Sequence, residues 1–223
     1  HALNLKQVVK GTLRNHGMKA TFMAKPFASL PGSGMHLHLS LYDNQGENLL
    51  APKNSKKLNQ AVSGILDLMP ESMIFCAPHA NSYHRFEENS YAPINATWGK
   101  DNRTTALRIP SGNEDSTRIE HRLSGADANP YLVMAMLISG FLHGFEEDPE
   151  IPPETIGNGY EDGSRPLPQS WEAALDLFQN KSRLSSILGQ EFSTLYTQLK
   201  SGEQKRFRRV ITPHEYDWYL HTV

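Results

Sequence analysis

Two histidines and a serine alternate with leucines in the segment Gly32–Ser40, which reads GSGMHLHLS. Alternation with a period of two predicts a strand with the leucines on one face and the polar side chains on the other: His36, His38 and Ser40. Neighbouring imidazoles and a hydroxyl can bind a divalent metal ion and donate to phosphate oxygens. The preceding glycines let a substrate approach the backbone closely. The alternative is a half-buried strand whose histidines only satisfy local hydrogen bonds, and the alternation alone leaves both readings open.

A second polar row follows in the segment 117–123. Arg118, Glu120 and Arg122 occupy alternate positions, so they share one face of a predicted strand. Such a row is costly on a buried face unless ligands neutralise it, and we therefore expect it to face a cleft that holds metal ions and phosphate. Glu120 is then a hard oxygen ligand; the alternative is an ion pair with its flanking arginines. We expect His36 and Glu120 to face the same cavity.

Helical periodicity and capping residues predict the helices that support these strands. Apolar residues in 5–13 recur at helical spacing before Gly17, and this first helix is expected to lie on the sheet. An apolar stripe over 58–69 predicts a helix that ends at Pro70. Further helices are predicted at 130–145, at 171–180, at 184–200, and after a capping box at 212–215.

Strands are predicted at 20–25, 36–41, 104–109 and 117–123, and the Pro- and Gly-containing segment 146–169 is expected to be irregular. This mixture of strands and helices indicates the α+β class, with polar chemistry on one face of a sheet and helices covering the other. A chain of 223 residues fits one domain or part of a larger one.

Composition excludes several classes of function. The formal net charge of −2 gives no field that favours nucleic acid or an anionic membrane surface. No apolar run is long enough to span a bilayer, so we expect neither kind of partner. The single cysteine, Cys76, cannot form an intrachain disulfide, which is consistent with a cytoplasmic location. The first residues do not form a signal peptide, and since the chain starts at His1 we expect it to begin mid-protein.

Four segments resemble the glutamine synthetase family in their order and spacing: Pro31–Ser40, Asn81–Arg85, Asn102–Pro110, and Arg118–Arg122 running into Ala128–Tyr131. The resemblance implies the family's catalytic-domain fold, an antiparallel sheet with a polar active-site face covered by helices. It also implies that ATP phosphorylates the γ-carboxylate of glutamate and that an amine then displaces the phosphate. Mg²⁺ or Mn²⁺ would neutralise the triphosphate.

The resemblance also implies roles for individual residues. The metal ligands are His36 and Glu120, and the glutamate-binding residues are Gly32, Arg85 and Arg122. The nucleotide-binding residues are His38, Ser40, Arg103, Arg108 and Arg118, and the catalytic roles fall to Arg103 and Tyr91. Guanidinium groups suit phosphate and carboxylate oxygens because they donate paired hydrogen bonds and keep their charge. Arg103 and Arg108 are an odd number of positions apart, so either Arg103 precedes the strand or a bulge re-aims one of them.

Two positions depart from the pattern of glutamine synthetases and bear on the substrate. Pro31 replaces an Asn beside the glutamate site. Tyr91 replaces a glutamate that, in ammonia-using members, lies on a mobile loop and helps to take a proton from ammonium. A phenol with an ordinary pKa of about 10 cannot attract ammonium as a carboxylate does, whereas its ring suits the methylenes and the cation of a larger amine. The segment therefore resembles the branch that makes γ-glutamyl amides of putrescine, polyamines or other amines.

Two alternatives to this function stay open. One is an ordinary glutamine synthetase that uses ammonia, and the other is a non-catalytic family member kept for binding or assembly. Glu87 or Glu88 could hold the distal ammonium of a diamine, although solvated loop charges are the simpler interpretation.

The resemblance further implies that residues 1–223 are the C-terminal part of a catalytic domain. The family's small N-terminal β-domain and the upstream strands with further metal ligands would then precede it, and full-length subunits would stack in homo-oligomeric rings. Residues 1–223 alone are expected to bind divalent ions weakly and to show no synthetase activity. They are also expected to self-associate through unpaired sheet edges.

Overall fold

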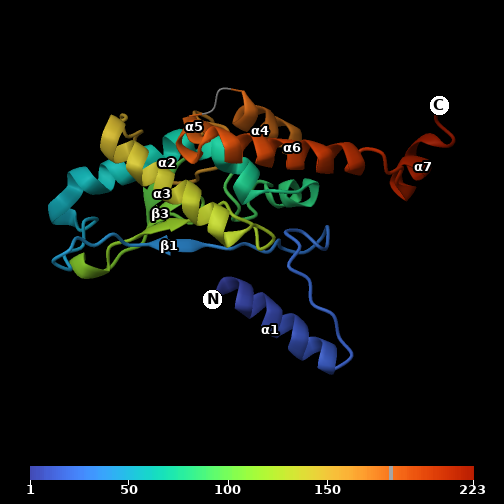
Figure 1. The fold of residues 1–223 in the computed structure, drawn as a ribbon, viewed down its shortest axis with the longest axis horizontal. Coiled ribbons are helices and arrows are strands. Elements are labelled where there is room, and N and C mark those ends of the chain that lie inside the picture. The colour runs from blue at the N-terminus through green and yellow to red at the C-terminus, as the bar shows by residue number, and fades with distance from the viewer. Residues whose placement is uncertain (181–182) are drawn as a thin grey trace.

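The computed structural model describes residues 1–180 and 183–223. A small sheet lies under a layer of helices, and α1 (Ala2–Asn15) stands apart on the other side of the sheet (Figure 1). The remaining helices are α2 (Ser55–Cys76), α3 (Pro130–Glu147), α4 (Trp171–Gln179), α5 (Arg183–Leu188), α6 (Gln190–Phe207) and α7 (Pro213–Tyr219). Short 3-10 turns are η1 (Pro52–Asn54), η2 (Ala80–Arg85) and η3 (Glu114–Ser116). The predicted α+β class is confirmed.

Four short strands form the sheet in the order β1-β4-β3-β2. They are β1 (Leu37–Leu39), β2 (Trp98–Lys100), β3 (Leu107–Ile109) and β4 (Ile119–His121). The strand β4 is antiparallel to β1 and β3, but β2 and β3 are parallel, so the sheet is mixed rather than wholly antiparallel. The connection 101–106 makes the parallel pairing possible because it brings the chain back beside the start of β2, where β3 begins. The register places His38 opposite Glu120.

The apolar side of the sheet packs against α2 and α3. Leu39, Leu107 and Ile119 are buried in one core with the side chains of these helices, and each such residue stabilises the fold by about 1.5–3 kcal/mol. Gly144 in α3 lies so close to α2 that a Cβ there would be 1.9 Å from the carbonyl oxygen of Gln60. Because the helices cover this face closely, the other face is left to carry the polar side chains.

The helix α2 does not end at Pro70 as predicted but continues to Cys76. A proline inside a helix removes one backbone hydrogen bond and crowds the preceding turn. The neighbouring Met69 and Met73 are fully buried, and their packing offsets that cost. Tertiary burial therefore overrides a local stop signal.

Two predictions about the N-terminal region are wrong. Every residue of α1 is at least partly exposed, with Val8 at 63%, and the helix touches the body through Lys6, which donates to the carbonyls of Ala126 and Ala128. The segment 20–25 is irregular rather than a strand. Its backbone at Lys25 is paired instead with a side chain, since Asn81 accepts from Lys25 N at 2.9 Å and donates to Lys25 O at 2.8 Å.

The C-terminal helices pack through aromatic rings. Tyr196 of α6 stacks on Phe75 of α2 with ring centroids 4.7 Å apart. The helix predicted at 184–200 is two helices, α5 and α6, because Gly189 between them has a φ of 91°. The capping box at the start of α7 is confirmed, since the Thr212 side chain accepts from the backbone N–H of Glu215 and Thr212 N donates to the Glu215 carboxylate.

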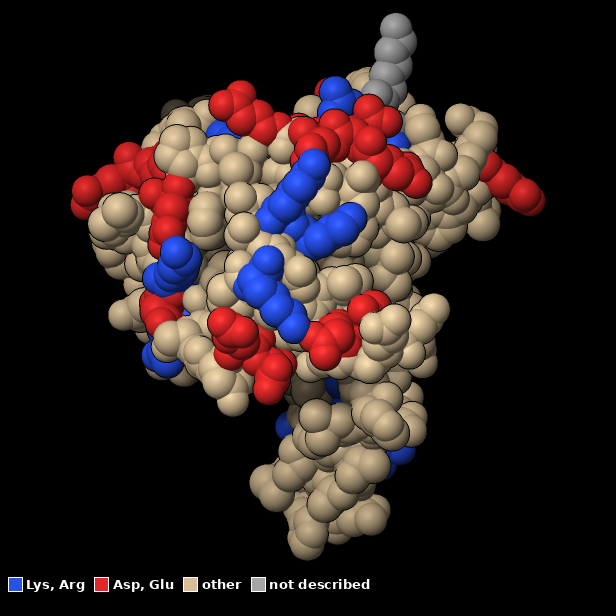
Figure 2. Space-filling view, turned by 90° about the vertical axis from the view of Figure 1, so that its left-hand side faces the viewer, with Lys and Arg blue, Asp and Glu red and all other residues tan. Residues whose placement is uncertain are grey.

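The surface carries charges of both signs. Figure 2 shows basic side chains lying between two groups of acidic ones on one end of the molecule. Near the start of α2, Lys53 pairs with Glu47 and Lys56 pairs with Asp148. In the part of the chain that is described, no helix is long and apolar enough to cross a bilayer.

Candidate active site

A cavity of about 360 Å³ opens on the polar side of the sheet. It is lined by Gly32, Gly34, His36, Arg85, Ser90, Tyr91, Ala92 and Arg122. Five of these were singled out from the sequence: Gly32, His36, Arg85, Tyr91 and Arg122. The structure thus brings together residues that lie up to 90 positions apart in the chain.

Two buried arginines give the cavity its positive charge. Arg85 ends η2 and donates through Nη1 to the carbonyl of Leu123 at 2.8 Å. Both Arg85 and Arg122 are about 95% buried, at 5% and 4% exposure. Burial lowers the pKa of Arg85 from its ordinary value, although Asp127 opposes the change. A guanidinium held this way keeps its charge and favours an anionic ligand.

Gly32 matters because Arg85 passes directly beside it. A Cβ at Gly32 would lie 2.6 Å from Cγ of Arg85 and 2.8 Å from the carbonyl oxygen of Ala24. The absence of a side chain at this position therefore lets the arginine reach the cavity wall.

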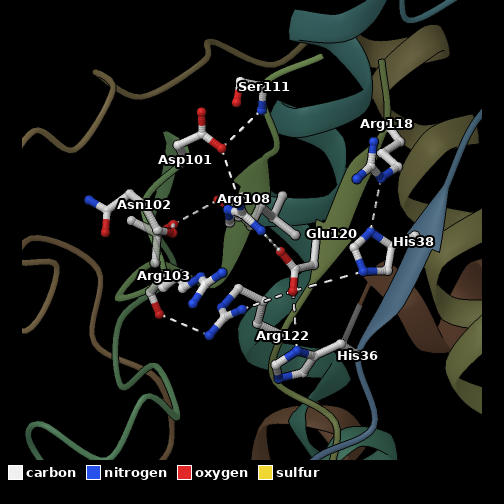
Figure 3. Close-up of polar contacts among 12 residues, drawn as sticks. His36, His38, Asp101, Asn102, Arg103, Arg108, Ser111, Arg118, Glu120 and Arg122 are labelled. Atoms are coloured by element: carbon white, nitrogen blue, oxygen red, sulfur yellow. Dashed lines mark hydrogen bonds and ion pairs between the residues drawn. The ribbon is translucent and has the colours of Figure 1, made fainter. Parts of the chain in front are cut away.

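Glu120 lies at the centre of the polar network (Figure 3). Its Oε1 accepts from Arg122 Nη1 at 2.9 Å, and its Oε2 accepts from Arg108 Nη1 at 2.9 Å. The Nδ1 atom of His36 is 3.2 Å from Oε1, and Nε2 of His38 is 4.0 Å from it. Burial pushes the pKa of Glu120 upward, but the hydrogen bond from Arg108 and the charge of Arg122 outweigh it and lower the pKa overall. Glu120 is therefore a carboxylate at neutral pH.

His36 and Glu120 fit as two ligands of a divalent ion. Burial, with a contribution from Arg122, lowers the pKa of His36, so its imidazole is neutral at pH 7 and keeps a lone pair for a metal. The predicted convergence of His36 and Glu120 is confirmed by their contact. In residues 1–180 and 183–223, no group of three His, Cys, Asp or Glu is placed to hold a metal ion. If a divalent ion binds here, His36 and Glu120 would supply two of its ligands.

Four of the residues expected to bind the nucleotide lie around Glu120 in Figure 3: His38, Arg103, Arg108 and Arg118. Arg108 on β3 also donates to Asp101 at 2.9 Å, and Arg118 Nε donates to His38 Nδ1 at 3.2 Å (Figure 3). Arg103 belongs to the turn before β3, which explains the odd spacing of Arg103 and Arg108 without a bulge. Ser40 follows β1, and its hydroxyl is 3.5 Å from the Thr117 carbonyl, so it lies at the outer end of this row.

Unpaired nitrogens in this network suit an anionic ligand. Within the described residues, the buried Nε atoms of Arg108 and Arg122 have no hydrogen-bond partner. A buried donor without a partner is costly. Phosphate and carboxylate oxygens are the groups that match such donors.

The chain is similar to known proteins over nearly its whole length. The profile of the glutamine synthetase catalytic domain matches residues 1–219. The chain belongs to the glutamine synthetase family. It is 44% identical over 222 residues to gamma-glutamylputrescine synthetase of Escherichia coli (strain K12), a match that covers 98% of this chain and 47% of that protein. It is 37% identical to gamma-glutamylethanolamide synthetase of Streptomyces coelicolor, covering 96% of this chain and 46% of that protein.

A solved structure of the same family shows the same fold. The ligand-free structure of GmaS superposes with a TM-score of 0.86 at 30% identity, and the match covers 97% of this chain and 52% of that one. The chain therefore spans about half the length of the relatives that it matches.

Three residues of this candidate site were missed from the sequence. Asp101 orients Arg108 and also accepts from the amide of Ser111, and that hydrogen bond, with the charge of Arg108, lowers the pKa of Asp101. An Asp next to an Asn is a turn signal, so the position could have been noticed. Ser90, which precedes Tyr91 in the same turn, accepts from the amide of Ala92, and Tyr160 donates to the carbonyl of Ala92. Tyr160 comes from a segment that was expected to be irregular, and no sequence signal links it to Tyr91.

Proposed function

We propose that the full-length protein is an ATP-dependent ligase that joins the γ-carboxylate of glutamate to an amine larger than ammonia. The observation that carries this proposal is the position of Tyr91. Tyr91 lines a cavity whose walls include Arg85 and Arg122, and the residue is 63% exposed. Relatives named for putrescine and ethanolamide products support the same class of reaction.

In the first step the chain's cations stabilise phosphoryl transfer. A free carboxylate is a poor electrophile, so the γ-carboxylate is first converted to an acyl phosphate by ATP. Arg108 and Arg103 donate to the oxygens on which negative charge develops. His36 and Glu120 would hold part of a divalent-ion site, and such an ion would neutralise charge on the triphosphate. Arg85 and Arg122 bind the carboxylates of glutamate.

In the second step the amine attacks the acyl carbon of the acyl phosphate from the side of Tyr91, and inorganic phosphate leaves as the C–N bond forms. The aromatic ring offers a face to the carbon chain and to the cation of an amine. A small, strongly hydrated ammonium ion is stabilised less by an aromatic surface than by a carboxylate. The amine must lose a proton before it attacks, and water at the open mouth of the cavity can accept it.

The remaining parts of the enzyme belong to the proposal. Since His36 and Glu120 are an incomplete ligand set, the other metal ligands would come from chain that precedes residue 1. We propose that residues 1–223 are the C-terminal part of the catalytic domain, and that the full-length protein works in the cytoplasm as a homo-oligomeric ring.

The test is an amine panel with the full-length protein. Phosphate release is measured with glutamate, ATP, Mg²⁺ and, in turn, ammonium, putrescine, ethanolamine and simple monoamines. We expect a kcat/KM for at least one organic amine that exceeds the value for ammonium by tenfold or more. A preference for ammonium would refute the role given to Tyr91. Turnover with none of the amines would favour the non-catalytic alternative.

A substitution sharpens the same test. Tyr91→Glu should shift the ratio of kcat/KM values toward ammonium by about tenfold, because a carboxylate attracts the small cation. Tyr42→Glu is the matched control, since Tyr42 is similarly exposed at 56% and does not line the cavity. That variant should leave the amine preference unchanged.

A further inference from the structure

The turn that carries Tyr91 has an unusual backbone. Asn89 has a φ of 62° and Tyr91 a φ of 60°. Asn adopts this left-handed region at modest cost, but a bulky tyrosine does so rarely. Two such residues within three positions form a strained turn, and strain of this kind persists only where the surroundings hold it.

Ser90, between these two residues, holds the turn from inside. Its hydroxyl lies 2.9 Å from the carbonyl oxygen of Arg85 and 2.6 Å from that of Glu87. The same oxygen accepts from the amide of Ala92 at 3.2 Å. The start and the end of the turn are thereby tied to one side chain.

Tyr160 holds the turn from outside. Its ring is 9% exposed, and its hydroxyl donates to the carbonyl of Ala92 at 3.2 Å. The segment that carries Tyr160 is itself anchored, because Gly159 N donates to Thr104 Oγ1 at 2.8 Å and Asn95 Nδ2 donates to the Gly159 carbonyl at 3.0 Å. These hydrogen bonds therefore fix the backbone next to Tyr160.

The turn is also joined to the reaction centre. Arg122 Nη2 lies 3.4 Å from the carbonyl of Tyr91, while Nη1 of the same guanidinium donates to Glu120 at 2.9 Å. Arg122 Nη2 also donates to the carbonyl of Arg103 at 2.9 Å. Arg122 thus connects the carbonyl of Tyr91 in the strained turn to the carboxylate of Glu120, the proposed metal ligand.

We propose that Tyr160 is a positioning residue that holds the Tyr91 turn in its left-handed conformation and so fixes the aromatic wall against which the incoming amine binds. This inference rests on the proposed function, in which Tyr91 contacts the amine. Selectivity for the amine then depends on a hydroxyl that never touches it. Ser90 acts in the same way from the other side of the turn.

The experiment compares two tyrosine hydroxyls in the full-length enzyme. Tyr160→Phe removes the hydrogen bond to Ala92 and keeps the ring. Tyr196→Phe is the matched control, since its hydroxyl donates to the carbonyl of Ile74 at 3.1 Å and its residue is similarly buried at 7%. We expect Tyr160→Phe to raise the KM for the best amine about three- to tenfold, the loss typical of one hydrogen bond. The KM values for ATP and glutamate should change less than twofold, and Tyr196→Phe should change none of the three.

A double-mutant cycle decides whether the effect passes through Tyr91. Glycine adopts a positive φ without strain, so in a Tyr91→Gly background the Tyr160→Phe change should alter the amine KM less than twofold. A persistent effect in that background would overturn the proposal, as would equal effects of Tyr160→Phe and Tyr196→Phe. If Tyr160→Phe lowers the melting temperature too far for assay, Ser90→Ala replaces it with the same expected result.

The cycle can be run with whichever amine the wild-type enzyme uses best. A preference for ammonium would therefore refute the proposed substrate while leaving the positioning role of Tyr160 to be decided by the cycle. Conversely, a large-amine preference with no coupling between positions 160 and 91 would keep the proposed function and refute this inference.

Discussion

The Nδ1 atom of His36 lies 3.2 Å from Oε1 of Glu120, although 84 positions separate them in the chain. The contact forms because β1 and β4 pair antiparallel with His38 opposite Glu120. The two polar rows therefore face the same side of the sheet, and their apolar partners face the helices. A metal ion placed at this contact would be bound by Glu120 of β4 and by His36, which directly precedes β1.

Glu120 should be the most sensitive position of the site. Glu120→Gln keeps the shape of the side chain but removes the charge that faces Arg108, Arg122 and His36. We expect kcat for phosphate release by the full-length enzyme to fall by about 10²–10³-fold, the size typical for loss of a charge-stabilising group in an active site. The matched change Asp101→Asn, at the exposed outer end of the Arg108 contact, should cost less than tenfold. Equal losses in the two variants would contradict a metal-binding role for Glu120.

Gly32→Ala should damage glutamate binding selectively. The new Cβ would meet Arg85 Cγ at 2.6 Å and the backbone carbonyl of Ala24 at 2.8 Å, so the arginine has to move away from the cavity. We expect the KM for glutamate to rise tenfold or more, with a smaller change in the KM for ATP. Gly163→Ala, in an open turn where a Cβ meets no atom within 4 Å and the backbone has no positive φ, is a control for the general cost of replacing glycine. A normal glutamate KM in Gly32→Ala would show that Arg85 does not bind glutamate.

The polar faces could be read from the sequence, whereas long-range packing could not. Period-two alternation placed His36 and Glu120 correctly because side-chain direction in a strand is a local property. The end of α2 at Pro70 was predicted wrongly because Met69 and Met73 are buried by α3 and the sheet, which no local signal reports. For the same reason the sequence does not reveal that Tyr160 reaches the Tyr91 turn. The roles assigned to the site residues remain predictions that these variants test.

Stability should fall in mild acid because of His121. This histidine is fully buried, and burial, with a smaller effect of His36, lowers its pKa from 6.5 to about 3. The unfolded chain binds the proton below pH 6.5 but the folded chain does not, so stability is lost as the pH falls from about 6.5 toward 3. The expected loss is at most about 1.4 kcal/mol per pH unit, or about 4–5 kcal/mol in total.

Thermal melting of the full-length protein between pH 5 and 8 measures this effect. His121→Leu has no titrating group and a similar volume, so its melting temperature should depend less on pH than that of the wild type below pH 6.5. Above pH 7.5 the slopes of the two proteins should agree. Parallel curves over the whole range would show that His121 is not buried as a neutral group.

Cys76 should be protected from thiol reagents in the folded protein. It ends α2, is fully buried, and burial raises the pKa of its thiol to about 12. Alkylation requires the thiolate, and at pH 8 only about one Cys76 in 10⁴ is ionised at that pKa. Iodoacetamide labelling followed by peptide mass spectrometry should therefore leave Cys76 unmodified in native buffer and label it fully in denaturant.

Gly144→Ala should speed this labelling by loosening the pair of helices α2 and α3. Its Cβ would meet the Gln60 carbonyl at 1.9 Å and force the two helices apart. Rapid labelling of the native wild type would mean that the helix layer over the sheet opens far more readily than its packing indicates.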